Sequence, residues 1–209
     1  MDVKHQPPQN GSDAAWAILH TPLSVPELTQ FCHDIERLFR INPMLSVRNW
    51  QNLGSNRYFF SGQNISQHTP FDFDLVLTVR QLSDGLQIEY DQGMKSRTTF
   101  IIEPASGLPD CRSRLTITDY YDGLPENKRM QQLHRVDKSI SIWAYDLQRF
   151  LIHWHRWSKY RLWRWYMQRI WQPMKPMGRR ITVILLWVTA AELALVLLGA
   201  AIYFLDYAA

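Results

Sequence analysis

The clearest pattern of hydrophobic and polar positions lies between residues 71 and 82, where the two kinds of side chain alternate. The apolar positions are Phe71, Phe73, Leu75, Leu77 and Val79, and Asp72, Asp74, Thr78 and Arg80 lie between them. Strict alternation predicts a strand with one buried face and one wet face, as antiparallel sheets have. Shorter patterns predict strands at 15–20, 46–53, 57–65, 86–91, 97–103 and 112–121, separated by turn signals such as Asp84-Gly85.

Two stretches have helical spacing instead. Between residues 24 and 41, apolar residues recur every three or four positions, behind a Ser24–Glu27 capping box with Pro26 in the first turn. Asn42-Pro43 ends this stretch. A second helix opens at Gly123 and carries a long apolar stripe: Val136, Ile140, Trp143, Leu147, Phe150, Trp154 and Trp157. A stripe of that length needs a large apolar partner, and the apolar face of the sheet is the natural one.

Residues 181–205 form an apolar run whose only charged residue is Glu192. In a helix the run reaches roughly 37 Å at ~1.5 Å per residue, which exceeds a hydrocarbon layer of about 30 Å. The run therefore predicts a single membrane span, and residues 1–8 show no secretory signal. Arg179 and Arg180 precede the span, so the positive-inside bias predicts a cytoplasmic N-terminal part, at the inner membrane in a bacterium.

The formal charge of +4 is distributed unevenly. Residues 1–146 contain 17 acids and 14 bases, whereas residues 147–180 contain nine bases and no acid. Because these bases are interleaved with Trp and Tyr beside a span, we expect them to bind anionic lipid head groups rather than nucleic acid. Each Lys or Arg near such a surface contributes about 1 kcal/mol to membrane binding.

Residues 158–177 are therefore predicted to form an amphipathic segment in the head-group plane. The alternative is that this segment continues the preceding helix and packs on protein. The predicted membrane-interface residues are Trp157, Arg161, Trp163, Arg164, Trp165, Arg169, Trp171, Arg179 and Arg180.

The sequence contains no motif that indicates catalysis or a metal site. Cys32 and Cys111 form neither a disulfide framework nor a CxxC motif. His153 and His155 point about 200° apart on a helix, so they cannot share a metal. We expect no metal, no cofactor and no catalytic residue from motifs alone, because no G-x-S-x-G context occurs either.

Glu192 lies near the middle of the predicted span, where a charge costs ~2.5 kcal/mol or more. Small residues nearby would allow close helix approach. We expect a helix–helix contact through Glu192, in a homodimer or with another membrane protein. The alternative is a protonated carboxyl group on a lone helix.

The order of elements is one strand, one or two helices, six antiparallel strands and one long helix. This order resembles the helix-grip fold of the START-like superfamily, also called SRPBCC. The resemblance covers roughly residues 14–157. The segments that show the resemblance are the opening from Ile18 to Leu28, the helix with Asp34-Ile35-Glu36-Arg37, the Asn42-Pro43 break and the final helix.

This resemblance implies an α+β domain in which a curved sheet of about seven strands wraps a C-terminal helix around an apolar cavity. Superfamily members bind lipids, sterols, quinones, plant hormones or polyketides, and some are aromatase/cyclases, so the fold does not settle function. This chain departs from most relatives of its size by its C-terminal extension. We expect a disordered lead (1–13), the START-like domain (14–157), the interfacial segment (158–177) and a transmembrane anchor with a short tail (178–209).

The predicted ligand pocket combines inward-facing strand residues with residues from the long helix. Asp119 and His20 are candidate polar groups of this pocket, although the simpler expectation places both at strand ends in solvent. The pocket residues are Phe73, Leu75, Leu77, Ile88, Tyr90, Leu115, Ile117, Asp119, Trp143 and Leu147.

The leading functional hypothesis is a membrane-tethered protein that binds or transfers a hydrophobic ligand, such as a lipid, quinone or isoprenoid, at the cytoplasmic membrane face. Its partners would be membrane lipids and that small molecule. One alternative is a cyclase-like enzyme on a hydrophobic substrate, which needs Asp119 or His20 inside the cavity. The other is a non-catalytic scaffold factor with a filled core, recruiting a membrane complex through Glu192.

Overall fold

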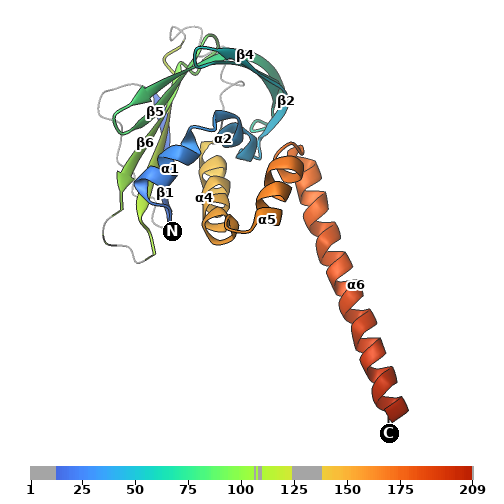
Figure 1. Ribbon diagram of the computed structural model, residues 1–209. Helices are drawn as coiled ribbons and strands as arrows, with labels where there is room; N and C mark the ends of the chain where they lie inside the picture. The colour runs from blue at the N-terminus through green and yellow to red at the C-terminus, as the bar shows by residue number, and fades with distance from the viewer. Residues whose placement is uncertain (1–12, 106, 108–109, 124–137, 209) are drawn as a thin grey trace. The chain divides into compact units, whose positions relative to one another are not determined.

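A computed structural model describes residues 13–105, 107, 110–123 and 138–208 (Figure 1). The predicted disordered lead, apart from Asp13, lies outside the described residues. Val136 also lies outside them, with the rest of residues 124–137. The chain divides into two units, Met1–Pro173 and Met174–Ala209.

The first unit is built on one seven-stranded antiparallel sheet in the order β1-β7-β6-β5-β4-β3-β2. Neighbouring strands from β2 to β7 follow each other along the chain, whereas β1 pairs with β7. The strands are β1 (Ala14–Thr21), β2 (Leu45–Gly54), β3 (Arg57–Asn64), β4 (Phe71–Leu82), β5 (Gly85–Tyr90), β6 (Arg97–Pro104) and β7 (Ser113–Tyr120).

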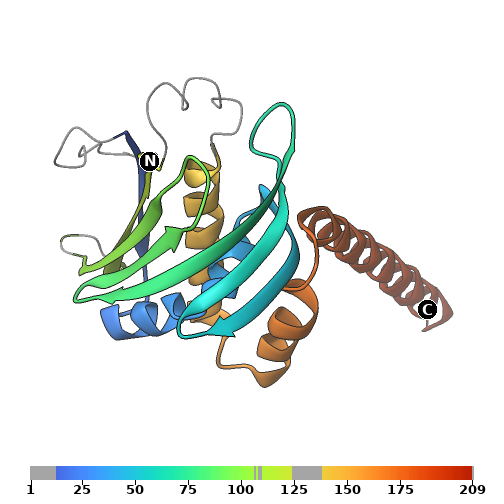
Figure 2. The ribbon, with the colours of Figure 1, turned by 90° about the horizontal axis from the view of Figure 1, so that it is seen from above.

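The helices of this unit lie on the concave side of the sheet or follow it. Figures 1 and 2 show the strands curving around α4, with α1 and α2 beside it. The predicted α+β helix-grip fold is therefore confirmed. The helices are α1 (Val25–Cys32), α2 (Ile35–Ile41), α4 (Ile140–Trp157), α5 (Arg161–Tyr166) and the π-helix η2 (Met167–Trp171).

The stretch from 24 to 41 forms two helices because His33 and Asp34 interrupt it. The capping box at the start of α1 is present, since the Ser24 N–H and hydroxyl both donate to the Glu27 carboxylate at 2.7 Å. The Asp34 carboxylate accepts from the Arg37 N–H at 3.1 Å and so caps α2.

Two buried polar contacts hold the amino-terminal half of α4. The Asn42 side-chain amide donates to the Ser139 hydroxyl at 2.8 Å, and both residues are fully buried. One turn further, the indole N–H of Trp143 donates to the Leu38 carbonyl at 2.9 Å. Two polar contacts in an apolar setting thus fix where α4 sits against α2.

Strand β1 faces the core with Ala17, Leu19 and Thr21. Ala17 and Leu19 are buried, whereas Trp16, Ile18 and His20 are half-buried on the other face. The alternation was predicted, but an inward-facing His20 is wrong. Helix α4 packs directly on β1, and the Gln148 amide donates to the His20 carbonyl at 3.0 Å. A small Ala17 side chain allows this close approach.

The second unit contains one long helix, α6 (Pro176–Ala208). It begins at Pro176, whose missing N–H costs nothing in the first turn. Among the described residues, this is the one helix whose length and composition would let it cross a membrane. Large apolar side chains such as Leu186, Trp187 and Leu195 are exposed along it.

Candidate functional site

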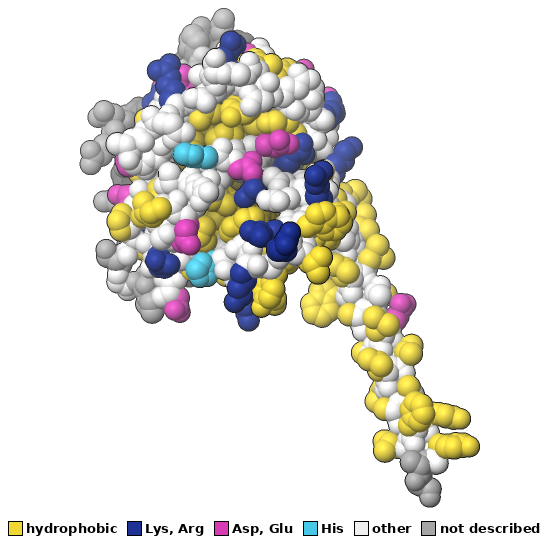
Figure 3. Space-filling model, viewed as in Figure 1, with side chains coloured by type: hydrophobic (Ala, Val, Ile, Leu, Met, Phe, Trp, Pro, Cys, Tyr) yellow, Lys and Arg dark blue, Asp and Glu magenta, His cyan; other side chains and the backbone are white. Residues whose placement is uncertain are grey.

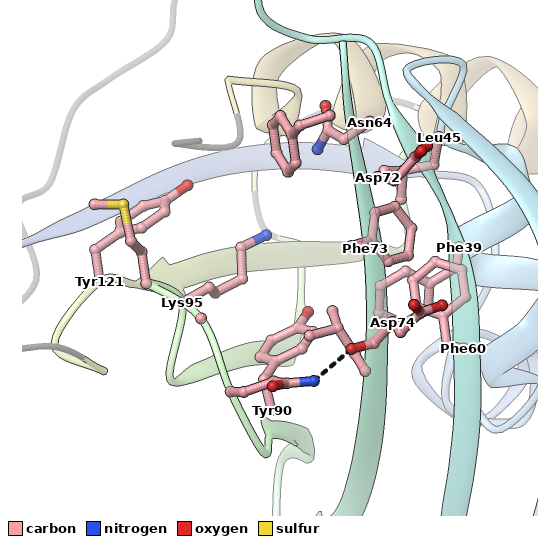
Figure 4. A pocket seen from close by; sticks show the side chains of 15 residues that line it. Phe39, Leu45, Phe60, Asn64, Asp72, Phe73, Asp74, Tyr90, Lys95 and Tyr121 are labelled. Carbon is pink, nitrogen blue, oxygen red and sulfur yellow. Dashed lines mark hydrogen bonds between the residues drawn. The ribbon is translucent and has the colours of Figure 1, made fainter. Parts of the chain in front are cut away.

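A cavity of about 450 Å³ opens between the sheet and α2 (Figure 4). This volume lies within the range of small-molecule sites. Its walls come from α2, from strands β2 to β5, from the β5–β6 loop and from the residue after β7. The lining residues are Phe39, Leu45, Phe60, Asn64, Phe71, Asp72, Phe73, Asp74, Leu75, Tyr90, Gln92, Gly93, Met94, Lys95 and Tyr121.

One wall of the cavity is aromatic. The ring of Phe60 lies 5.0 Å from that of Phe39 and 4.8 Å from that of Phe73, centroid to centroid. Gly62 on β3 makes room for this cluster, because a Cβ there would lie 3.2 Å from the Phe73 ring and 2.4 Å from the Ser46 carbonyl oxygen. Tilted rings of this kind form a stable apolar surface for a ligand.

The opposite wall carries a buried ion pair. Lys95 extends from the β5–β6 loop toward the interior in Figure 4, and its Nζ lies 2.7 Å from Oδ2 of Asp119. Asp119 is 0% exposed. A carboxylate at such a position is stable only when it is paired and hydrogen-bonded, and the nearby ammonium supplies the pairing.

A short chain of hydroxyl groups supports the same carboxylate. Thr98 donates to Oδ1 of Asp119 at 2.5 Å, and the Tyr90 hydroxyl lies 2.8 Å from Thr98 Oγ1. Because Thr98 has a single hydroxyl proton, Tyr90 is the donor to Thr98. Two lining residues, Tyr90 and Lys95, are thus held from behind by Asp119.

The rim of the cavity is polar. Asp72, Asp74, Gln92 and Gly93 are its exposed lining residues. The Gln92 amide donates to the Asp74 main-chain carbonyl at 2.6 Å, which joins the β5–β6 loop to β4. An apolar interior behind a polar rim suits an apolar ligand that enters from water or from a carrier.

Of the ten predicted pocket residues, Phe73, Leu75 and Tyr90 line this cavity. Six others lie in the hydrophobic core behind it, and Asp119 lies behind Lys95. The expectation that Asp119 reaches solvent at a strand end is wrong, because its side chain shares the buried face of β7 with Leu115 and Ile117. The six core residues are Leu77, Ile88, Leu115, Ile117, Trp143 and Leu147.

Sequence reasoning did not find the lining residues from α2, β2 and the β5–β6 loop. Phe39 lies on a helix and Leu45 at the start of a strand, so their place in the cavity depends on how these elements pack. Lys95 sits in a loop, where no periodicity assigns a direction to its side chain. No local signal singles out Lys95, because its neighbours are mostly polar and Arg97 follows two residues later.

The predicted interfacial segment lies at the other end of α4. Trp163 packs on Trp154 and Trp171 on Phe150, each with ring centroids 5.5 Å apart, near the carboxy-terminal end of α4. The cavity lies at the amino-terminal end, where Trp143 contacts Phe39 at 5.5 Å. Trp171 contacts Phe150, which is seven residues or about 10 Å along α4 from Trp143, and no residue of the segment lines the described cavity.

Parts of that segment are exposed and basic. Trp157 and Trp165 are 41% and 56% exposed, whereas Trp163 and Trp171 are half-buried against α4. Figure 3 shows Lys and Arg side chains gathered where α4 ends and α5 begins, beside exposed hydrophobic side chains. Arg161, Arg164, Arg169 and Arg180 are exposed, and Arg179 is not.

The described residues hold no group of three or more His, Cys, Asp or Glu side chains that could bind a metal. Burial raises the pKa of the Cys32 thiol to about 12, so this cysteine is not a nucleophile at neutral pH.

No protein-family model matches the chain, and no curated protein matches it by sequence. Among solved structures, a protein from Thermus thermophilus is 11% identical with a TM-score of 0.45, covering 65% of this chain and 94% of its own. A STAR-related lipid transfer protein from Xanthomonas axonopodis is 10% identical (TM-score 0.42; 66% and 85% covered). A polyketide-cyclase-like protein from Corynebacterium glutamicum is 13% identical (TM-score 0.41; 72% and 97% covered). The structural neighbours thus include START lipid-transfer and polyketide-cyclase-like proteins.

Proposed function

We propose that this protein binds a hydrophobic small molecule in the cavity of its helix-grip domain and keeps that domain at a membrane through α6. The observation that carries the proposal is the cavity itself. Aromatic rings line one side, and a buried Lys95–Asp119 pair stands behind the other. A packed core would have filled this space with side chains.

The tether is supported by the composition and length of α6 and by the bases that precede it. We place the domain on the cytoplasmic side, following the positive-inside bias. The exposed residues Trp157, Trp165, Arg161 and Arg164 would rest in the head-group region at the far end of α4 from the cavity. A ligand would then leave the bilayer before it enters the cavity, which suits transfer to or from a second carrier.

A cyclase-like enzyme is the second candidate, and the burial of Asp119 favours it. Both carboxylate oxygens, however, already face protein groups, because Oδ1 accepts from Thr98 and Oδ2 lies 2.7 Å from the Lys95 ammonium. This arrangement suits a group that holds Lys95 and Tyr90 in place better than one that takes a proton from a substrate. Binding without catalysis is therefore the function we propose.

Native mass spectrometry of the full-length protein in a neutral detergent tests this function. We expect a stoichiometric apolar guest on the wild-type protein. Leu75→Trp places an indole in the cavity and should abolish guest binding, while Leu53→Trp, at a half-exposed position outside the lining, should retain it. Circular dichroism checks that both variants fold.

A wild-type protein that carries no guest after incubation with a membrane lipid extract would contradict the proposal. If instead a protein companion copurified and was lost in Glu192→Leu, the scaffold alternative would be supported.

A further inference from the structure

The basic side chain that lines the described cavity is already paired with a carboxylate before any ligand arrives. Lys95 is the only base among the described lining residues, and its side chain is 15% exposed. Its countercharge, the Asp119 carboxylate, lies 2.7 Å away and is fully buried. The ammonium therefore enters the cavity as half of a neutral pair rather than as an unbalanced positive charge.

This balance determines which polar groups the cavity can accept. An anionic head group beside Lys95 would have to share its single positive charge with Asp119. The head group and the Asp119 carboxylate would then lie close together, and two negative charges so placed repel strongly in apolar surroundings. It would also lose its hydration. The lining carboxylates Asp72 and Asp74 add negative charge only.

An uncharged polar group meets no such obstacle. A hydroxyl or carbonyl oxygen brings no net charge into the cavity, and its desolvation is offset by hydrogen bonds to groups on the polar wall, where Lys95 and Tyr90 are held in place. The aromatic wall formed by Phe39, Phe60 and Phe73 accommodates the apolar remainder.

We propose that the cavity selects uncharged lipids, with a hydroxyl or carbonyl head group, against anionic lipids of the same chain length. This inference rests on the proposed function, because it names the class of ligand that the same cavity takes. Asp119 sets the selectivity by neutralising Lys95.

Competition for a photoactivatable probe tests the selectivity. The full-length protein is placed in nanodiscs of neutral lipid with a diazirine analogue of cetyl alcohol, and crosslinks are mapped by peptide mass. Cetyl alcohol and cetyl sulfate, which share a chain, compete at equal bilayer fractions. In the wild-type protein we expect cetyl sulfate to compete at least about tenfold more weakly, a ratio that corresponds to 1.4 kcal/mol.

Two variants locate the cause. Asp119→Asn keeps the shape of the side chain but leaves the Lys95 charge uncompensated, so cetyl sulfate should compete as well as the alcohol or better. Lys95→Gln/Asp119→Asn restores neutrality and should restore the preference for the alcohol. If Asp119→Asn fails to fold, the competition ratio of the two lipids in the wild-type protein still tests the selectivity. The double variant still tests whether a neutral wall keeps the preference for the alcohol.

Equal competition by both lipids in the wild-type protein would overturn the selectivity while leaving hydrophobic ligand binding intact. An unchanged ratio in a folded Asp119→Asn variant would overturn the role of Asp119. If the probe labels no lining peptide and neither lipid competes, the proposed function itself fails, and the selectivity with it.

Discussion

The contact between Trp143 and its surroundings offers a direct test of how the sheet grips α4. Trp143 is 1% exposed, its ring lies 5.7 Å from that of Phe100, and its indole N–H donates to the Leu38 carbonyl. Replacing it by alanine removes the ring, leaves a void beneath the cavity and deprives Leu38 of this donor. Substitutions of this kind cost about 3–5 kcal/mol, a large share of the roughly 5–15 kcal/mol that stabilises a typical domain.

Trp157 provides a matched control on the same helix. It is 41% exposed at the last position of α4, so Trp157→Ala removes the same side chain with a much smaller loss of buried contacts. We expect Trp157→Ala to change the free energy of unfolding by no more than about 0.5 kcal/mol. The difference between the two variants therefore isolates the burial of Trp143.

Pulse proteolysis in urea measures the folded fraction of the domain while α6 remains in detergent. With a slope near 2 kcal/mol per molar urea, a cost of 4 kcal/mol lowers the midpoint by about 2 M. If Trp143→Ala shifted the midpoint no more than Trp157→Ala does, α4 would not be held by the sheet as described. The packing that surrounds the cavity beside α4 would then also differ from that described.

Two further predictions concern the surface of the domain. Trp165 is exposed beside Arg161 and Arg164. Trp165→Ala should therefore reduce crosslinking of the domain to photoactivatable anionic lipid head groups several-fold without affecting membrane insertion. Unchanged crosslinking would place the segment away from the bilayer. Hydrogen bonds from the Ser24 hydroxyl and N–H hold the pKa of Glu27 below its ordinary value of 4.5. The stability that ionised Glu27 contributes is therefore complete above pH 4.5 and disappears as the pH falls through the lowered pKa. Glu27→Gln should therefore destabilise the domain by up to about 1 kcal/mol at pH 7 and have no effect in strong acid, as urea midpoints across pH would measure; an equal effect at both pH values would contradict the capping role.

The elements with strict periodicity could be predicted from the sequence, and those that depend on tertiary contacts could not. Strand β4 was predicted with its observed bounds, Phe71–Leu82, because large apolar and charged side chains alternate along it. For β1 the alternation was visible, but its inner face was not. Trp16 and Ile18 are the larger residues, whereas the close approach of α4 selects Ala17.

The cavity illustrates the same limit. Phe73, Leu75 and Tyr90 were predicted to line a pocket because strand alternation gives their direction, and they do line this cavity. The position of Lys95 depends on its pairing with Asp119 across the β5–β6 loop and β7, which local patterns do not encode. Whether an inward residue meets an open space or another side chain is decided by packing, and so Leu77 and Ile88 are core residues.

The pairing of β1 with β7 has a consequence for the order in which the domain forms during synthesis. Ala14 lies opposite Tyr120, about 100 residues later in the chain. At a translation rate of roughly 5–20 residues per second, β1 waits on the order of 5–20 s after it is made before β7 exists. The sheet is completed only when α4, which follows β7, is about to emerge, and α6 is synthesised after both. β1 would thus stay unpaired while about 100 residues are synthesised, and a chaperone that covers β1 during this interval would be expected to raise the yield of folded protein.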